Sequence, residues 1–284
     1  MKIAFVFLLN LCLIGAAVAQ IASSTGIEPG ADASSNPVAG SSSPTSFRIN
    51  NKVYAGKEKN PVSQSVTMFY KGRVYDFMSN PDETIIFDPE LQRFLIISAL
   101  TKTQCAVTLD EVETFERMMK EAIPKVKDEF IKSCLSPEFE ISQDPETDEW
   151  VYSAPRLTYR VKAQKEENPG DALRYAQFAN KYALLNVILV PQSIPPFARI
   201  AVNNDLAQKR LIPGEITITL QAEVKPLSFN QGKETIRTTH VFVSGLGDYD
   251  MSKIRKAGEN YGRFKQVSFT DYQKGLQNKL SPKK

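Results

Sequence analysis

Residues 62–107, with the sequence VSQSVTMFYKGRVYDFMSNPDETIIFDPELQRFLIISALTKTQCAV, decide the fold of this chain. Short runs of β-branched and aromatic residues alternate there with turn signals: Lys71-Gly72, Asn80-Pro81-Asp82 and Asp88-Pro89-Glu90. The runs lie close together and no helical spacing separates them, so the stretch predicts an antiparallel meander of short strands. An alternating stretch at 47–54 precedes the meander and marks the expected start of folded structure.

The segment that follows the meander is predicted to be an amphipathic helix. It opens with Thr108-Leu109-Asp110-Glu111, a capping box in which the threonine and glutamate side chains each accept a hydrogen bond from a backbone N–H group. Its apolar residues recur at helical spacing: Leu109, Val112, Phe115, Met119, Ile123, Val126 and Phe130. Pro124 is expected to kink or interrupt this helix, because its ring clashes with the preceding turn.

The rest of the chain mixes strands and helices. We expect strands at 139–142, 149–153, 156–163, 216–224 and 235–244, and helices at 171–190, 197–209, 250–262 and 270–279. Pro213-Gly214 is expected to end the helix at 197–209. The predicted fold class is therefore α+β, a mainly antiparallel sheet with an N-terminal meander and amphipathic helices packed on one face. The folded region spans 47–284, as one unit or as two halves that meet near residue 135.

Residues 1–19 are typical of a secretory signal peptide, with Lys2 before a short apolar run. The run ends in Ala17-Val18-Ala19, which predicts cleavage after Ala19 rather than a retained membrane anchor. Lipid attachment at Cys12 is disfavoured, because the residue before it is not small. Residues 20–46 consist mostly of Ser, Ala, Gly and Pro and are predicted to be a disordered linker. We therefore expect a secreted or periplasmic bacterial protein with no transmembrane segment after cleavage.

The mature chain would keep two cysteines, Cys105 and Cys134, which could form one disulfide in an oxidising compartment. A straight helix over 109–133 would hold its ends roughly 36 Å apart, whereas a disulfide needs Cα atoms within about 7 Å. A bridge therefore requires a bend near Pro124, and we expect free thiols rather than a disulfide.

The net charge of +3 indicates no nucleic-acid partner, but the charge is unevenly distributed. Residues 110–149 carry 13 acidic and 5 basic side chains, and residues 250–284 carry 9 basic and 3 acidic ones. Two solvated faces of opposite sign are the simpler interpretation. The sharper one is that the basic segment 250–284 contacts an anionic surface, such as lipid headgroups or an acidic wall polymer.

Catalytic and cofactor motifs are scarce. His240 is the only histidine, which excludes a multi-histidine metal site within one chain and favours a hydrogen-bonded strand residue. Neither a Gly-x-Ser-x-Gly elbow nor a phosphate-binding loop is present, and no cofactor is expected. Gly245-Leu246-Gly247-Asp248 is interpreted as a strand-to-helix turn with an aspartate cap.

Carboxylates are the remaining route to catalysis or metal binding. Asp76, Asp82 and Glu83 are weak candidates for a pair that hydrolyses a polysaccharide, because such pairs come together from positions that sequence does not reveal. The loop Asp144–Glu149 could hold Ca²⁺ through oxygen ligands, but it lacks the spacing of an EF-hand and is interpreted as a solvated turn.

Two polar residues, Asn186 and Arg199, stand out in the apolar segment 183–202, and Asn203 follows directly after it. A polar side chain inside an apolar stretch must be hydrogen-bonded or face a cavity, because burying an unpartnered polar group is costly. The three residues could line the floor of a ligand pocket. The alternative, which we favour, is a structural network that fixes the two helices around them.

The strands and turns of 71–97, which include KGRVYDF, NPDETII and FLII, resemble a segment of bacterial periplasmic lipoprotein-carrier proteins. The resemblance implies an open half-barrel whose helices cover an apolar cavity. The chain departs from that family in having no clear helix between the export signal and the first strand, and in its helical pair at 171–209. Resemblance at the level of the fold does not assign a function.

Two functions follow as hypotheses. The first is an exported, non-enzymatic binding or interaction protein that holds an apolar ligand or a protein partner. The second is a carboxylate-based hydrolase of wall or extracellular polymers. The absence of catalytic motifs favours the first.

Overall fold

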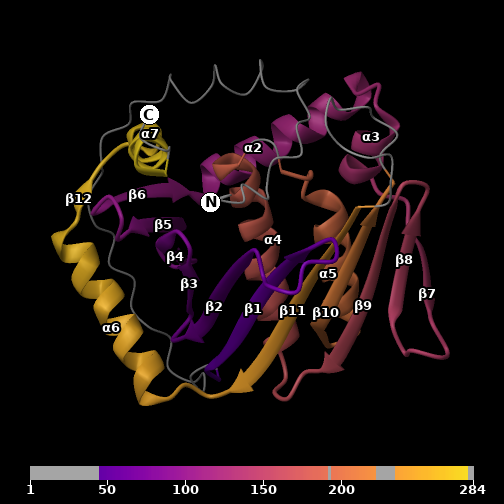
Figure 1. The fold of residues 1–284 in the computed structure, drawn as a ribbon, viewed down its shortest axis with the longest axis horizontal. Coiled ribbons are helices and arrows are strands. Elements are labelled where there is room, and N and C mark those ends of the chain that lie inside the picture. The colour runs from indigo at the N-terminus through magenta and orange to yellow at the C-terminus, as the bar shows by residue number, and fades with distance from the viewer. Residues whose placement is uncertain (1–44, 191–192, 222–233, 281–284) are drawn as a thin grey trace.

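The computed structural model describes residues 45–190, 193–221 and 234–280 (Figure 1). These residues form one twelve-stranded sheet with the order β12-β6-β5-β4-β3-β2-β1-β11-β10-β9-β8-β7. All neighbours pair antiparallel except β12, which runs parallel to β6. The predicted α+β class with a mainly antiparallel sheet is confirmed. The predicted signal peptide and all but the last two residues of the linker lie outside the described residues and stay predictions.

The elements alternate between strand groups and helices along the chain. The strands are β1 (Phe47–Ala55), β2 (Ser63–Tyr70), β3 (Arg73–Ser79), β4 (Asp82–Asp88), β5 (Arg93–Ser98), β6 (Thr103–Thr108), β7 (Glu140–Gln143), β8 (Trp150–Ala154), β9 (Leu157–Lys165), β10 (Leu211–Leu220), β11 (Glu234–Ser244) and β12 (Lys265–Gln266). The helices are α2 (Leu109–Ala122), the 3₁₀ turn η1 (Ile123–Lys125), α3 (Glu129–Leu135), α4 (Asp171–Leu189), α5 (Phe197–Gln208), α6 (Asp248–Arg263) and α7 (Phe269–Leu280).

The meander and its capping box are confirmed. Strands β2 to β6 pair in sequence order. The first tight turn has positive φ at both Lys71 (46°) and Gly72 (77°), a conformation whose twist matches a two-residue hairpin. At the start of α2, Thr108 Oγ1 accepts a hydrogen bond from the Glu111 N–H at 3.2 Å, and the Thr108 N–H donates to Glu111 Oε2 at 2.7 Å.

Pro124 interrupts the helix as predicted, and this interruption carries the chain across the molecule. Helix α2 ends at Ala122, the turn η1 contains Pro124, and α3 then leads to β7 at the far edge of the sheet. From that edge the chain builds inward through β8, β9 and β10, until β11 pairs with β1. The sheet is therefore continuous through both parts of the chain, and the proposed division near residue 135 stays a prediction.

The helix predicted at 197–209 is present as α5, but the prediction that Pro213-Gly214 ends it was wrong. Pro213 and Gly214 lie inside β10, where the pairing with β9 shifts register between Pro213 and Glu215. Such a bulge tolerates a proline that cannot donate to the ladder. Helix α5 ends at Gln208 instead, and Arg210, with φ at 58°, turns the chain into β10. The last residues of the strand predicted at 216–224 lie outside the described residues.

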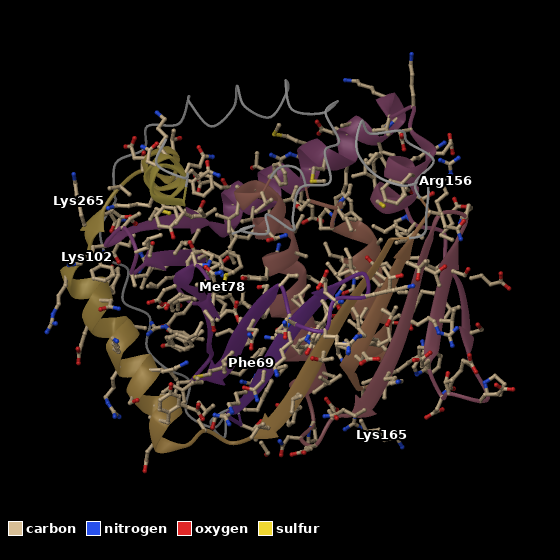
Figure 2. All side chains as sticks on the ribbon, viewed as in Figure 1. Phe69, Met78, Lys102, Arg156, Lys165 and Lys265 are labelled. Carbon is tan, nitrogen blue, oxygen red and sulfur yellow. The ribbon has the colours of Figure 1, made fainter. Side chains whose placement is uncertain are left out.

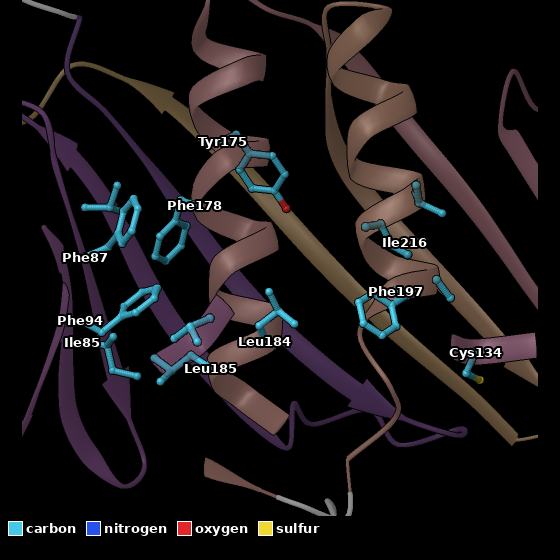
Figure 3. Close-up of a cluster of buried hydrophobic side chains, with 14 of the residues drawn as sticks. Ile85, Phe87, Phe94, Cys134, Tyr175, Phe178, Leu184, Leu185, Phe197 and Ile216 are labelled. Atoms are coloured by element: carbon cyan, nitrogen blue, oxygen red, sulfur yellow. The ribbon is translucent and has the colours of Figure 1, made fainter. Parts of the chain in front are cut away.

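The main core lies between one face of the sheet and helices α2, α3, α4, α5 and α7. Figure 3 shows Phe178 and Leu185 of α4 on the side of the strand residues Phe87 and Phe94, and Leu184 toward α5. The Phe178 ring packs edge-on against the Phe69 ring, with 5.9 Å between the centroids, and its centroid lies 6.0 Å from that of Phe87. Aromatic side chains from α4 and the meander therefore fill the space between helix and sheet.

Helix α6 departs from the predicted placement of all helices on one face. Its Ile254 and Ala257 pack against Met68 and other meander residues that point away from the main core, so the helices cover both faces of the sheet. The cap of α6 also differs from the prediction. The carboxylate of Asp250, not Asp248, accepts the Gly247 N–H at 3.0 Å. The other oxygen of Asp250 binds Arg48 of β1 at 2.6 Å, which fixes the helix to the sheet.

We predict that Phe178→Ala lowers the free energy of unfolding by about 3–5 kcal/mol, because the change leaves a cavity between α4 and the meander. Leu173→Ala on the same helix is the control, since Leu173 is 55% exposed and its change should be nearly neutral. Urea unfolding monitored by circular dichroism measures both. Equal losses for the two variants would contradict this account of the core.

Candidate functional site

Of Asn186, Arg199 and Asn203, which were predicted to lie together, the structure connects only Arg199 and Asn203. Arg199 donates from Nε to Asn203 Oδ1 at 3.0 Å and from Nη2 to the Tyr175 hydroxyl at 3.2 Å. Asn203, which is 1% exposed, donates in turn to Asn180 Oδ1 at 3.0 Å. The Asn186 side chain makes no hydrogen bond to another described residue. The structure therefore places Arg199 and Asn203 in a network that links α4 and α5, and leaves Asn186 outside it.

A second polar network crosses the helix-facing side of the sheet. We call it the polar row and define it as His240, Asn51, Thr67, Asp76 and Glu83. His240 Nδ1 lies 2.8 Å from Asn51 Oδ1, Asn51 Nδ2 donates to Thr67 Oγ1 at 2.8 Å, and Thr67 Oγ1 donates to Asp76 Oδ1 at 2.7 Å. Each of these bonds joins neighbouring strands, from β11 through β1 and β2 to β3, and Glu83 lies on the next strand, β4.

Two tyrosines from the helices complete the polar row. Tyr182 of α4 donates to Asp76 Oδ2 at 3.0 Å, and Tyr272 of α7 donates to Glu83 Oε2. One general signal could have pointed to them, which is that a buried tyrosine hydroxyl needs a hydrogen-bond partner. Their partners became visible only when the strand register was known.

The predicted carboxylates are placed differently from one another. Asp76 and Glu83 are 3% and 6% exposed and point toward the helices, whereas Asp82 is exposed. Asp76 pairs with Ile85 and Met78 with Glu83, so the two acids are diagonal neighbours, a relation that spans about 7–8 Å. Burial raises the pKa of Asp76, opposed by hydrogen bonds from Thr67, Ser65 and Tyr182. Burial also raises the pKa of Glu83, opposed by the Tyr272 hydroxyl and reinforced by the charge of Asp76.

His240 is a strand residue within a hydrogen-bonded network. Its Nε2 lies 3.2 Å from Thr238 Oγ1, and its ring meets Tyr175 edge-on at 6.4 Å. Burial and the nearby charge of Arg199 lower its pKa from 6.5 to about 3, so the ring is neutral at physiological pH. The contact with Tyr175 brings the polar row next to the Arg199 network.

Arg160 offsets part of the charge of the acidic loop at Asp144–Glu149. Arg160 binds Asp144 at 2.5 Å and Glu149 at 2.7 Å. Asp144 Oδ1 also accepts the N–H groups of Glu146 and Thr147, which closes the turn. The hydrogen bond from Arg160 holds the pKa of Asp144 below its usual range. Within residues 45–190, 193–221 and 234–280, no group of three or more His, Cys, Asp or Glu side chains is arranged to hold a metal ion.

The two cysteines are separate buried thiols in the structure. Cys105 lies on β6 and Cys134 on α3, each 0% exposed and unbridged. The chain does bend at Pro124, yet the bend does not bring the thiols together. Burial raises the pKa of both to about 12, so both thiols are protonated at physiological pH.

The basic C-terminal segment presents most of its cations on and beside α6. Arg255, Lys256, Arg263 and Lys265 are exposed, and none forms an ion pair with another described residue. Figure 2 shows Lys265 beside Lys102 at one end of α6, in agreement with the hydrogen bond between their backbones at 3.2 Å. We call Lys102, Arg255, Lys256, Arg263 and Lys265 the basic patch.

Two exposed tyrosines accompany the basic patch. Tyr249 is 69% and Tyr261 42% exposed. Near the start of α6, Lys253 lies between the rings of Phe77 and Tyr249, at 5.5 Å and 5.3 Å from their centroids. Sequence reasoning found the cations of this surface but not its tyrosines, which needed the orientation of α6.

Comparisons with known proteins do not identify a family. No family model and no curated protein matches the chain. A solved structure of PNGF-II in the C2 space group is similar with a TM-score of 0.33 and 8% identity, over 83% of this chain and 33% of that one. The chain thus spans about one third of that protein, and the match is too weak to support a conclusion. Among the described residues, no helix has both the length and the apolar character that a membrane span requires.

We predict that Arg199→Met lowers the free energy of unfolding by about 1–3 kcal/mol, because buried Asn203 and Tyr175 lose a donor. Arg117→Met on the exposed side of α2 is the control and should have little effect. Chemical unfolding compares the two variants. An unchanged stability for Arg199→Met would point to a ligand-facing role instead of the structural network.

We also predict that His240 remains neutral until strongly acidic pH. The unfolded chain takes up a proton near pH 6.5 and the folded chain near pH 3, so stability contributed by neutral His240 is lost as pH falls across this interval. Because the chain has one histidine, its ring signals can be followed by NMR without overlap. A titration midpoint near 6.5 in the folded protein would contradict the prediction.

Proposed function

We propose that this chain is a non-enzymatic interaction protein that binds an acidic polysaccharide through the basic patch and its tyrosines. The observation that carries the proposal is the exposed face of α6, where Arg255, Lys256 and Arg263 lie without acidic partners among the described residues. Arginine forms paired hydrogen bonds to carboxylates, and clustered cations attract a polyanion before contact. Tyr249 and Tyr261 add rigid flat rings that can pack on sugars at low entropic cost.

The packing of α6 favours a polymer over a lipid surface. Helices that enter a bilayer interface insert an apolar face, and the apolar residues of α6, including Ile254 and Ala257, already pack against the sheet. The helix is also tied at both ends. Asp250 binds Arg48 at one end, and the Gln104 side chain donates to the carbonyls of Tyr261 and Phe264 at the other. A fixed helix presents cations at constant spacings, which suits a repeating anionic chain.

Two other functions receive less support. A hydrolase would need a polymer to reach Asp76 and Glu83, but both lie beneath helices and are almost fully buried. An apolar ligand between sheet and helices would compete with Phe178, Leu184 and Leu185, which already fill that space. The export of the protein and its resemblance to lipoprotein carriers stay predictions.

The test exchanges charge on α6 and compares it with an equal change elsewhere. The triple variant Arg255→Glu, Lys256→Glu and Arg263→Glu should bind immobilised polygalacturonate about tenfold more weakly or worse. The matched control is Lys125→Glu, Lys127→Glu and Lys132→Glu, which changes net charge equally at exposed positions near α3 and should retain binding. Binding should also weaken with added salt, because exposed charges are screened.

Two further measurements separate the alternatives. The double variant Tyr249→Ala, Tyr261→Ala should bind polygalacturonate more weakly than the wild-type protein. Neither protein should bind neutral dextran. Vesicles that contain phosphatidylglycerol serve as the competing surface. Equal loss of binding in both triple variants would show only a net-charge effect. A protein that binds the vesicles but not the polysaccharide would indicate a lipid surface as the partner.

A further inference from the structure

The C-terminal helix α7 is held on the sheet by one deeply buried polar contact. Tyr272 is 1% exposed, and its hydroxyl donates to Glu83 Oε2 on β4. The other residues of α7 that pack on the core, Phe269 and Leu276, are only partly buried. The Gln273 side chain adds a longer hydrogen bond of 3.4 Å to the Leu189 carbonyl. The Glu83–Tyr272 pair is therefore the central attachment of this helix.

Glu83 has no compensating cation among the described residues. The groups that face it are Asp76 from β3, Ser98 from β5, Cys105 from β6, Tyr182 from α4 and Tyr272 from α7. All of these are acids, hydroxyls or a thiol, and none carries a positive charge. A buried carboxylate without a cation is costly, so the protonated form is favoured while α7 covers the site.

We propose that Glu83 and Tyr272 form a pH-dependent latch, which holds α7 on the sheet while Glu83 is protonated and weakens when Glu83 ionises. An ionised Glu83 needs water, and the elements around it differ in how easily they can admit it. Strand β4 pairs with β3 and β5 along its whole length. Helix α7 is the last described element and can lift away from the sheet without breaking a strand ladder.

The direction of the pH effect follows from the environment of Glu83. Burial raises its pKa above the ordinary 4.5. The latch is therefore fully closed below the ordinary value and is lost as pH rises through the raised value. Asp76 adds to the effect, because its negative charge opposes the ionisation of Glu83.

The labelling rates of the two buried thiols report whether α7 is packed on the sheet. Cys105 lies on β6, the strand that α7 packs against. The charge of an ionised Glu83 raises the pKa of Cys105, so ionisation alone would slow its labelling and only lifting of α7 would speed it. Cys134 on α3 is the internal control. Both thiols have a pKa of about 12, so the general increase of reactivity with pH cancels in the ratio of their labelling rates. Labelling of the full chain with a thiol reagent, with each cysteine quantified by peptide mass spectrometry, gives this ratio directly.

The latch predicts that the ratio of Cys105 to Cys134 labelling rises roughly tenfold or more as pH increases through the transition. Glu83→Gln should keep the ratio low at every pH, because the amide cannot ionise. Tyr272→Phe should raise the ratio even in acid, because the attachment is removed. Asp76→Asn should move the transition to lower pH and supplies a test if Glu83→Gln does not fold.

Four outcomes would overturn the latch. Three of them are a wild-type ratio that stays constant with pH, a Glu83→Gln variant that keeps the wild-type response, and an Asp76→Asn variant whose transition does not move. The fourth is parallel labelling of both cysteines, which would indicate global unfolding. The result does not depend on whether the basic patch binds a polysaccharide.

Discussion

The double pairing of β1 is the constraint on which the rest of the structure depends. This strand pairs with β2 along seven positions on one side and with β11 along nine on the other. Phe47 and Ile49, which are 0% and 1% exposed, place both halves of the sheet over one core. Because β2 is the next strand and β11 nearly the last, almost the whole folded chain must be arranged before β1 gains its second neighbour. Such non-local pairing costs loop-closure entropy before the favourable contacts form, which predicts slow folding.

The polar row adds specificity to this core. Polar groups inside a protein are costly unless their hydrogen bonds are satisfied. Asn51, Thr67 and Asp76 satisfy one another only when β1, β2 and β3 are in this register, since a shift by one residue would turn each side chain to the other face. Tyr182 then fixes α4 relative to the same strands. The network thus selects one arrangement from the many that a purely apolar core of similar volume would accept.

Local chemistry made much of the fold predictable. The meander, the capping box at Thr108 and the break at Pro124 depend on residues within a few positions of one another, and each occurs as expected. The bulge at Pro213 and the outer position of α6 were missed, because they depend on pairing with β9 and on the second face of the meander. The same limit applies to the sites.

From the sequence we singled out Arg199 and Asn203 as polar residues that need partners, and Asp76, Asp82 and Glu83 as weak candidates for catalytic carboxylates. Asp82 is exposed, and the other four lie in buried networks. The sequence could not reveal their partners, because the partners come from elements that are distant in the chain. Asn186 shows the opposite case. Its place in an apolar segment suggested a pocket, but its side chain makes none of the hydrogen bonds that connect Arg199 and Asn203 to α4.

The path from α6 to α7 has a consequence for association between copies of the chain. The two helices lie on opposite faces of the sheet. Strand β12 connects them and pairs with Thr103 and Gln104 at the start of β6. The connection therefore folds over an outer strand whose free N–H and C=O groups would otherwise be a template for another strand. During synthesis this border stays unpaired until residues 265–266 emerge, so the growing chain exposes an open strand edge for most of the time that its folded part is being made.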